Sequence, residues 1–197
     1  MASAEVEICN LALARLGARS IVSLTEDSVN ARECNRVYAH ARDTELRSHP
    51  WSFARTRVQL AALSTPPIFG YANQFPLPDD YLRILTDNGR GSSLRAQDDF
   101  QIEFTGDTRV ILTDLAAPIN LVYIRTVTDV TQFDQLFTDL LVARIAHDVC
   151  EKITQSNSKR ELAVAAYTAA KREARRINGF ERGAQEAPED PWLIARR

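Results

Sequence analysis

The sequence is poor in the residues and motifs from which most catalytic and cofactor sites are built. It holds 7 glycines and 3 histidines in 197 residues, and no nucleotide-binding glycine loop or Gly-x-Ser-x-Gly motif occurs in it. No apolar run approaches the roughly 20 residues that cross a membrane, and the first residues lack the basic and apolar regions of a signal peptide. These absences argue against an enzyme and a membrane protein, and they predict synthesis in the cytoplasm.

Cysteine and histidine are placed in ways that suit neither disulfides nor metal. Cys9, Cys34 and Cys150 are odd in number and have no C-x-x-C spacing, which predicts buried thiols in a reducing compartment. Residues 147–151 contain His, Asp, Cys and Glu, but neighbouring residues on a helix point about 100° apart and cannot close on one ion. The sequence therefore predicts no metal and no cofactor.

Charge gives little reason to expect binding to nucleic acid or to acidic membranes. The net charge is −2, so the chain as a whole does not attract polyanions. Residues 58–130 carry five arginines against nine acidic residues, a net charge of −4. The basic cluster Lys171, Arg172, Arg175 and Arg176 is explained by the C-terminal end of a helix, where cations complement the helix dipole.

What the sequence does contain is a change of hydrophobic period, from helical to extended and back. Over residues 4–16, and from near residues 25–28 to His49, apolar side chains recur every three or four positions, which predicts two helices. Gly17 ends the first helix. Pro50 ends the second, because the residue before a proline is restricted to extended geometry.

The helical period returns near Thr131 and predicts two further helices. Thr131 with Asp134, and Ser158 with Glu161, each pair an N-cap residue with an acid three positions on. The third helix is apolar nearly all round, so we expect it at the centre of the helical part. The fourth is rich in alanine, which permits close approach to a neighbouring helix.

Between the helices, the pattern predicts five or six short strands. The clearest is a hairpin over residues 100–112, in which Gly106 supplies the positive φ of the turn. The other predicted strands span residues 57–63, 69–75, 81–86 and 119–126. This spacing predicts a small antiparallel sandwich or barrel.

Together these patterns predict an α+β fold. We expect a four-helix bundle from residues 1–54 and 131–178, and an antiparallel β-sandwich or barrel from residues 55–130, inserted between helices two and three. Residues 179–197 are polar and predict an extended C-terminal tail.

Three groups of residues are candidates for assembly or support rather than for chemistry. At the first boundary, Pro50, Trp51 and Phe53 are expected to fill the corner between helices and strands, since two large rings bury much area. The alanine-rich fourth helix is a candidate inter-subunit helix through Ala163, Ala166, Ala170 and Ala174. In the predicted tail, three apolar residues either fold back onto their own domain or anchor a partner such as a portal protein: Trp192, Leu193 and Ile194.

Neighbouring carboxylates are the strongest remaining hint of catalysis, and it is a weak one. Asp79 and Asp80 follow Pro78, and Asp98 and Asp99 lie in a later loop. Turn formation and solubility explain acids in loops better than acid–base chemistry does. We expect no catalytic residues here.

Four stretches within residues 7–83, taken in order, carry a family resemblance. They are Glu7-Ile8-Cys9-Asn10-Leu11-Ala12-Leu13-Ala14-Arg15-Leu16-Gly17; Ile21-Val22-Ser23-Leu24 leading into Ala31-Arg32-Glu33-Cys34; Arg42-Asp43 with Leu46-Arg47-Ser48-His49-Pro50-Trp51-Ser52-Phe53-Ala54; and Gln74-Phe75-Pro76-Leu77-Pro78-Asp79-Asp80-Tyr81-Leu82-Arg83. The chain resembles the head-to-tail adaptor proteins of tailed bacteriophages, called tail tubular protein A in short-tailed phages. The later helices match that family in hydrophobic pattern more than in residue identity.

The resemblance implies a structural virion protein of the tail or neck. Such subunits form a homo-oligomeric ring, usually dodecameric, that docks under the portal protein and receives a downstream tail or nozzle protein. Genomic DNA passes through the lumen without sequence-specific binding. The resemblance also implies that helices pack side by side around the ring while the β module projects along its axis.

Two other functions remain open from the sequence. The chain can be another ring component of the same particle, such as a tail terminator or nozzle protein, which would bind tail tubes rather than portal rings. It can also be a small hydrolase with a site in a loop cleft around Asp79, Asp80 and Asp98.

Overall fold

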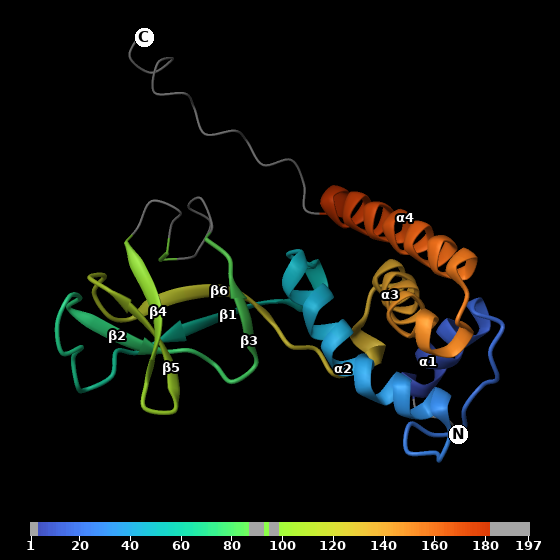
Figure 1. The fold of residues 1–197 in the computed structure, drawn as a ribbon. Helices are drawn as coiled ribbons and strands as arrows, with labels where there is room; N and C mark the ends of the chain where they lie inside the picture. The colour runs from blue at the N-terminus through green and yellow to red at the C-terminus, as the bar shows by residue number, and fades with distance from the viewer. Residues whose placement is uncertain (1–3, 87–92, 95–98, 182–197) are drawn as a thin grey trace, which may run out of the picture.

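The computed structural model describes residues 4–86, 93–94 and 99–181 (Figure 1). Over these residues the chain is α+β, as the sequence predicts, with four α-helices and six strands. All six strands lie between the second and third helices in the sequence. Within the described residues, no helix combines the length and the apolar character needed to cross a membrane. The helices are α1 (Ala4–Arg15), α2 (Val29–Ser48), α3 (Gln135–Thr154) and α4 (Asn157–Glu181).

The six strands form two antiparallel sheets of three strands each, in the orders β1-β6-β3 and β2-β5-β4. In Figure 1 they lie at one end of the molecule and the helices at the other. A 3₁₀ turn precedes them (η1, Ser52–Ala54) and another follows them (η2, Val130–Gln132). The strands are β1 (Arg55–Leu60), β2 (Asn73–Pro76), β3 (Tyr81–Ile84), β4 (Phe100–Thr105), β5 (Thr108–Thr113) and β6 (Ile119–Arg125).

The predicted hairpin is confirmed, and one predicted strand is largely wrong. β4 and β5 pair in register from Phe100↔Thr113 to Thr105↔Thr108, and Gly106 in the turn has a φ of +60°. The strand expected over residues 69–75 begins only at Asn73. The residues before it form an exposed loop, because Pro66, Pro67 and Gly70 interrupt the extended pattern.

Helix starts differ from prediction where two capping residues compete. Asp134, not Thr131, caps α3, and its Oδ1 accepts hydrogen bonds from the backbone N–H groups of Leu136 and Phe137. At α4 the cap is Ser156 rather than Ser158: its Oγ accepts from Lys159 N at 3.4 Å. A side chain caps only if the chain enters the helix directly after it. At its other end, α4 continues to Glu181, past the expected start of the tail at residue 179.

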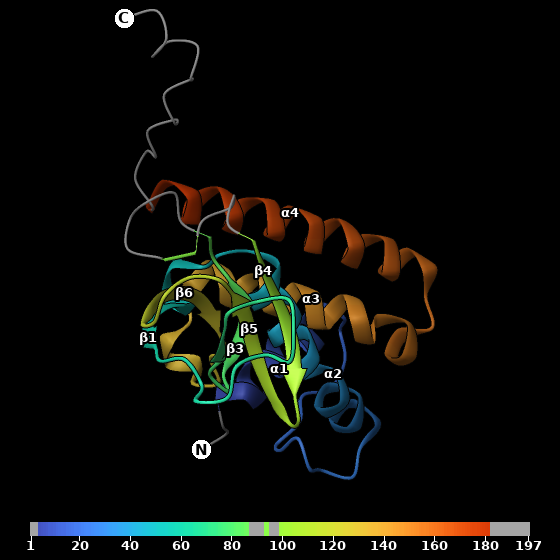
Figure 2. The same cartoon turned by 90° about the vertical axis from the view of Figure 1, so that its left-hand side faces the viewer.

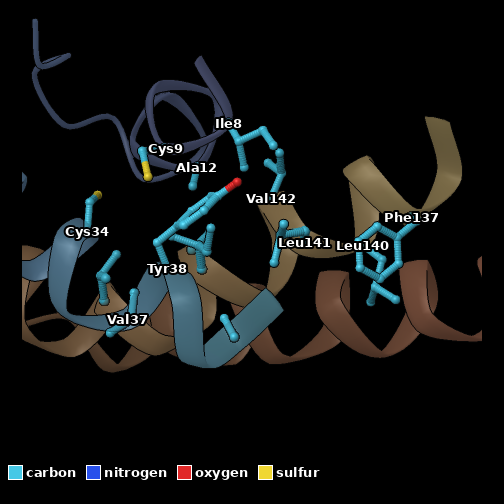
Figure 3. Packing of buried hydrophobic residues seen from close by; sticks show 14 of the residues in the cluster. Ile8, Cys9, Ala12, Cys34, Val37, Tyr38, Phe137, Leu140, Leu141 and Val142 are labelled. Atoms are coloured by element: carbon cyan, nitrogen blue, oxygen red, sulfur yellow. The ribbon is translucent and has the colours of Figure 1, made fainter. Parts of the chain in front are cut away.

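The helical core is built around α3, which packs against each of the other three helices, as predicted. Figure 3 shows Tyr38 of α2 pointing between α1 and α3, with Cys9 and Cys34 facing each other nearby. The predicted burial of all three thiols is confirmed. The hydrogen bond with Cys34, together with burial, raises the pKa of Cys9. These thiols are therefore packing residues.

The strands enclose a second, smaller apolar cluster. Side chains from both sheets meet in it, among them Phe75 and Ile111 from one sheet and Leu121 and Tyr123 from the other. The outer strand β4 contributes little, because five of its six residues are exposed. Figure 2 shows this part facing the viewer, with α4 running along the outside of the helices behind it.

Candidate interaction surfaces

The corner between α2 and β1 is packed against α3. Trp51 is 1% exposed, and its Nε1 donates a hydrogen bond to the backbone oxygen of Glu45 at 2.8 Å. The ring of Phe137 meets Trp51 edge-on at 5.1 Å between centroids and Phe53 at 5.0 Å. Such edge-to-face pairs add stability beyond the area they bury. Trp51 is thus a packing residue, positioned because Pro50 ends α2 and turns the chain toward the strands.

The end of α4 is attached to the same corner. Oδ1 of Asn178 accepts hydrogen bonds from the backbone N and the Oγ of Ser52, both at 2.9 Å. Its Nδ2 lies 2.9 Å from Nε2 of His49, and Arg175 donates to Oγ of Ser48 at 3.1 Å. Because a buried amide side chain needs hydrogen-bond partners, these bonds hold the last turns of α4 against the corner.

A buried carboxylate joins α2, α3 and α4. Glu45 is 0% exposed and accepts a hydrogen bond from Tyr167 Oη at 2.6 Å. Lys171 lies 3.3 Å from it and Arg144 3.4 Å, and Arg144 also pairs with Asp148 at 2.7 Å. A buried charge is tolerated only when partners compensate it. The network therefore holds the three helices in one arrangement and leaves neither carboxylate oxygen of Glu45 open to solvent.

Glu45 was not predicted from the sequence, although its position carries a signal. On α2 the buried residues Ala31, Cys34, Tyr38 and Ala41 recur at three and four positions, and Glu45 is the next member of that series. An acid within a core-facing stripe is a sign of a buried partner. The identity of that partner, on α3 and α4, could not be inferred from local spacing.

The alanines of α4 divide between two environments. Ala163 and Ala174 are buried in the helical core of their own subunit, so those two positions are not open to a neighbouring subunit. Ala170 is half-buried, and Ala166 is exposed. The exposed face of α4 also carries Leu162, which is 70% exposed. A role of α4 between subunits stays a prediction, and it now depends on the exposed side of the helix, which carries Leu162 and Ala166. We call this side the outer face of α4.

A groove of about 230 Å³ lies beside Ala166, at the junction of α1, α3 and α4. Small side chains leave room for it, and Lys159 borders it by donating from Nζ to the backbone oxygen of Leu16 at 2.8 Å. Two charged residues line the groove, Arg15 and Lys159, and both are basic. The apolar lining residues are Leu16, Ala143, Ala146, Leu162, Ala163 and Ala166.

A larger hollow, of about 790 Å³, lies between the loop of residues 65–71 and the outer strand β4. Three large apolar side chains beside it are exposed: Ile68 by 98%, Phe69 by 85% and Phe104 by 64%. Monomeric proteins seldom expose several large apolar side chains together, and such patches mark interaction sites. We name Ile68, Phe69 and Phe104 the β patch.

The charged residues lining this hollow are all acidic: Asp99, Glu103 and Asp114. Tyr71 donates a hydrogen bond to Asp99 at 2.9 Å. Desolvation and this bond raise the pKa of Tyr71, and the carboxylates of Asp114 and Glu103 act in the same direction. The β patch therefore lies beside an acidic hollow, which suits a protein partner with complementary basic groups. At its edge the guanidinium of Arg109 stands over the Phe104 ring, 5.1 Å from the ring centre.

Of the paired acids considered from sequence, Asp80 and Asp99 accept hydrogen bonds from tyrosines. Asp80 accepts a hydrogen bond from Tyr123 Oη at 2.8 Å; burial and this bond raise the pKa of Tyr123 to about 12. Asp79 is exposed in the adjoining turn, and Asp98 lies outside the described residues.

In residues 147–151, His147 Nδ1 lies 2.9 Å from Asp148. Over the part of the chain that the structure describes, no group of three or more His, Cys, Asp or Glu is arranged to hold a metal ion.

The predicted anchor residues Trp192, Leu193 and Ile194 lie outside the described residues, so their role stays a prediction. Comparison of the chain with models of known protein families gives no match, and comparison with curated proteins gives none either. The site therefore has to be interpreted from its own geometry.

Proposed function

We propose that this protein is a structural head-to-tail connector of a bacteriophage virion, forming a ring between portal and tail through which DNA passes. The observation that carries the proposal is the pair of separate exposed apolar surfaces. One is the β patch, and the other is the outer face of α4 with Leu162. A subunit that contacts neighbours sideways and a different protein along the axis needs two such surfaces.

Ring geometry explains why the surfaces belong to different parts of the chain. A closed ring uses a heterologous interface, in which two different faces of each subunit meet. In the proposal the four helices act as a bundle in the ring wall, with the outer face of α4 against the next subunit. The two sheets act as a sandwich that projects along the axis and presents the β patch to the next tail component.

The acidity of the strand region fits a channel that conducts DNA. Basic linings bind DNA through release of counterions, and that binding would slow passage. Residues 58–130 carry a net charge of −4, so the strand region as a whole would not bind DNA in this way. The resemblance of residues 7–83 to phage adaptor proteins supports the same function.

A binding experiment separates the connector from its closest alternative. Purified protein is mixed with portal rings, and separately with tail tubes, of the phage that encodes the chain, and binding is followed by co-sedimentation and electron microscopy. A connector is expected to form its own ring on each portal ring. Phage adaptor rings usually have twelve subunits. Binding to tail tubes alone would instead indicate a terminator or nozzle component.

Two surface variants test the assignment of the surfaces. Leu162→Ser is expected to impair ring formation, whereas Phe69→Asn is expected to leave rings intact and to weaken attachment of the next tail component. Neither side chain is in a core, so both variants should fold like the parent. The proposal is wrong if the parent protein forms no ring and binds neither partner.

A further inference from the structure

The groove beside Ala166 leaves apolar surface exposed on an otherwise well-packed helical part. Leu162 is 70% exposed at its edge, and the alanines that line it have only methyl groups. We propose that Trp192 of the same chain occupies this groove, with the preceding residues running back along the outer face of α4. The inference concerns the free subunit and does not depend on the connector function.

The length of chain after α4 is sufficient for this path. α4 ends at Glu181, and a helix rises about 1.5 Å per residue, which places Ala166 about 22 Å before that end. An extended chain advances about 3.3 Å per residue, so the segment from Glu181 to Trp192 reaches about 36 Å. This length covers the distance and leaves enough chain to reverse direction.

The exposed face of α4 provides a continuous path. Leu162, Ala166, Ala169 and Phe180 are exposed, and their successive spacings of four, three and eleven residues keep them on one side of the helix. Phe180 is the first apolar side chain that a returning segment meets, and Leu162 is the last. Both large side chains would lose contact with water along the same path.

Charge favours this occupant over an arbitrary apolar peptide. The charged residues that line the groove are Arg15 and Lys159. Glu189 and Asp190 stand directly before Pro191 and Trp192 in the sequence. When Trp192 fills the groove, these two carboxylates lie two and three residues before it, about 7–10 Å away along the extended segment. The basic lining still attracts them over that range. By contrast, the acidic hollow beside the β patch would repel them.

The size of the groove fits a single aromatic side chain. Its volume is about 230 Å³, and its floor consists of Ala143, Ala146 and Ala163. A tryptophan buries more apolar area than any other side chain while fixing only two side-chain angles, so it gains most from such a site. A segment seated there is not available to a portal ring until it is released.

Fluorine NMR of the full-length protein tests the proposal directly. The chain has two tryptophans, so labelling with 5-fluorotryptophan gives two resonances, and Trp192→Phe assigns one of them. Ala166→Glu places a charge in the groove at an exposed helix position. Ala165→Glu is the matched control, because Ala165 is exposed on the same helix but does not line the groove. The Trp51 resonance reports whether each variant keeps its fold.

The expected result is a Trp192 resonance shielded from solvent in the parent and in Ala165→Glu. In Ala166→Glu it should move to the position found in a synthetic peptide of residues 182–197. A Trp192 resonance already at the peptide position in the parent would overturn the proposal, and so would equal shifts in both variants. A shielded resonance that is lost on dilution, together with a dimer in sedimentation, would show that the occupant comes from a second copy and would overturn the assignment to the same chain.

Discussion

The helical part and the strand part of this molecule use their polar residues in opposite ways. In the helices, Glu45 is buried and joins three elements through Tyr167, Lys171 and Arg144. In the strands, the acids Asp99, Glu103 and Asp114 line an open hollow beside exposed apolar side chains. The buried carboxylate of the helical part thus holds one arrangement of the helices, whereas the acids that line the hollow face solvent.

The contrast indicates that the buried network and the core of the helices form the framework, and that the β patch is a contact surface. Elements fixed by buried networks and large cores are the last to open, and exposed loops and edge strands are the first. α3 contacts all other helices, whereas β4 is an edge strand with nearly every residue exposed. We therefore expect substitutions in the helical core to act on stability and substitutions in the β patch to act on binding.

The largest expected effect comes from Trp51→Ala. Removing a fully buried aromatic ring should lower the free energy of unfolding by about 3–5 kcal/mol, because Phe137 and Phe53 lose their contact with it. Urea denaturation measures the change. The control is Ile68→Ala in the exposed loop, expected within about 0.5 kcal/mol of the parent. A loss below about 1 kcal/mol for Trp51→Ala would show that the corner does not support the fold.

Glu45→Ala should cost about 3 kcal/mol, because it leaves Lys171 and Arg144 without their shared buried partner. Since a buried pair is little screened, the loss should be similar at low and high salt, as measured by thermal and urea denaturation. The control is Glu173→Ala, which breaks an exposed pair with Arg176 and should leave the unfolding midpoint unchanged. Equal effects of the two substitutions would remove the contrast between buried and surface charge.

Asp134→Ala should cost about 1 kcal/mol, because the N-cap of α3 loses the acceptor for two backbone N–H groups. Ser158→Ala is the control, since Ser156 caps α4 instead. Circular dichroism during thermal unfolding measures both. If Ser158→Ala by itself cost about 1 kcal/mol, the start of α4 predicted from the sequence would be right and the start at Ser156 wrong.

The smallest expected effect on stability, and the largest on binding, belongs to Phe69→Asn in the β patch. Its side chain is 85% exposed, so the unfolding free energy should change by less than about 0.5 kcal/mol. Attachment of the next tail component should nevertheless weaken, which co-sedimentation measures. A variant that is destabilised but binds normally would reverse the roles assigned to the two parts.

Sequence patterns were sufficient for the elements whose period is strong and local. The four helices, the hairpin around Gly106 and the buried cysteines all follow from spacing. Prediction was wrong where local signals compete, as at Thr131 and Ser158, because a capping side chain is chosen by the path of the chain into the helix.

The candidate surfaces were harder to predict because they depend on contacts between distant segments. The sequence predicts a strand that begins at Phe69, yet two prolines and a glycine keep the loop that carries Ile68 and Phe69 out of the sheet. The partners of Glu45 lie about a hundred residues away in sequence, beyond any periodic signal. The groove beside Ala166 exists only because three helices meet there.

The most direct test of the connector proposal is electron cryo-microscopy of the purified protein bound to portal rings, at a resolution that separates helices from strands. We predict a closed ring, dodecameric if it follows the phage adaptors, in which the outer face of α4 contacts the next subunit and the β patch points along the axis away from the portal. A ring held together through its strand regions would contradict it, as would portal rings that remain bare at saturating protein.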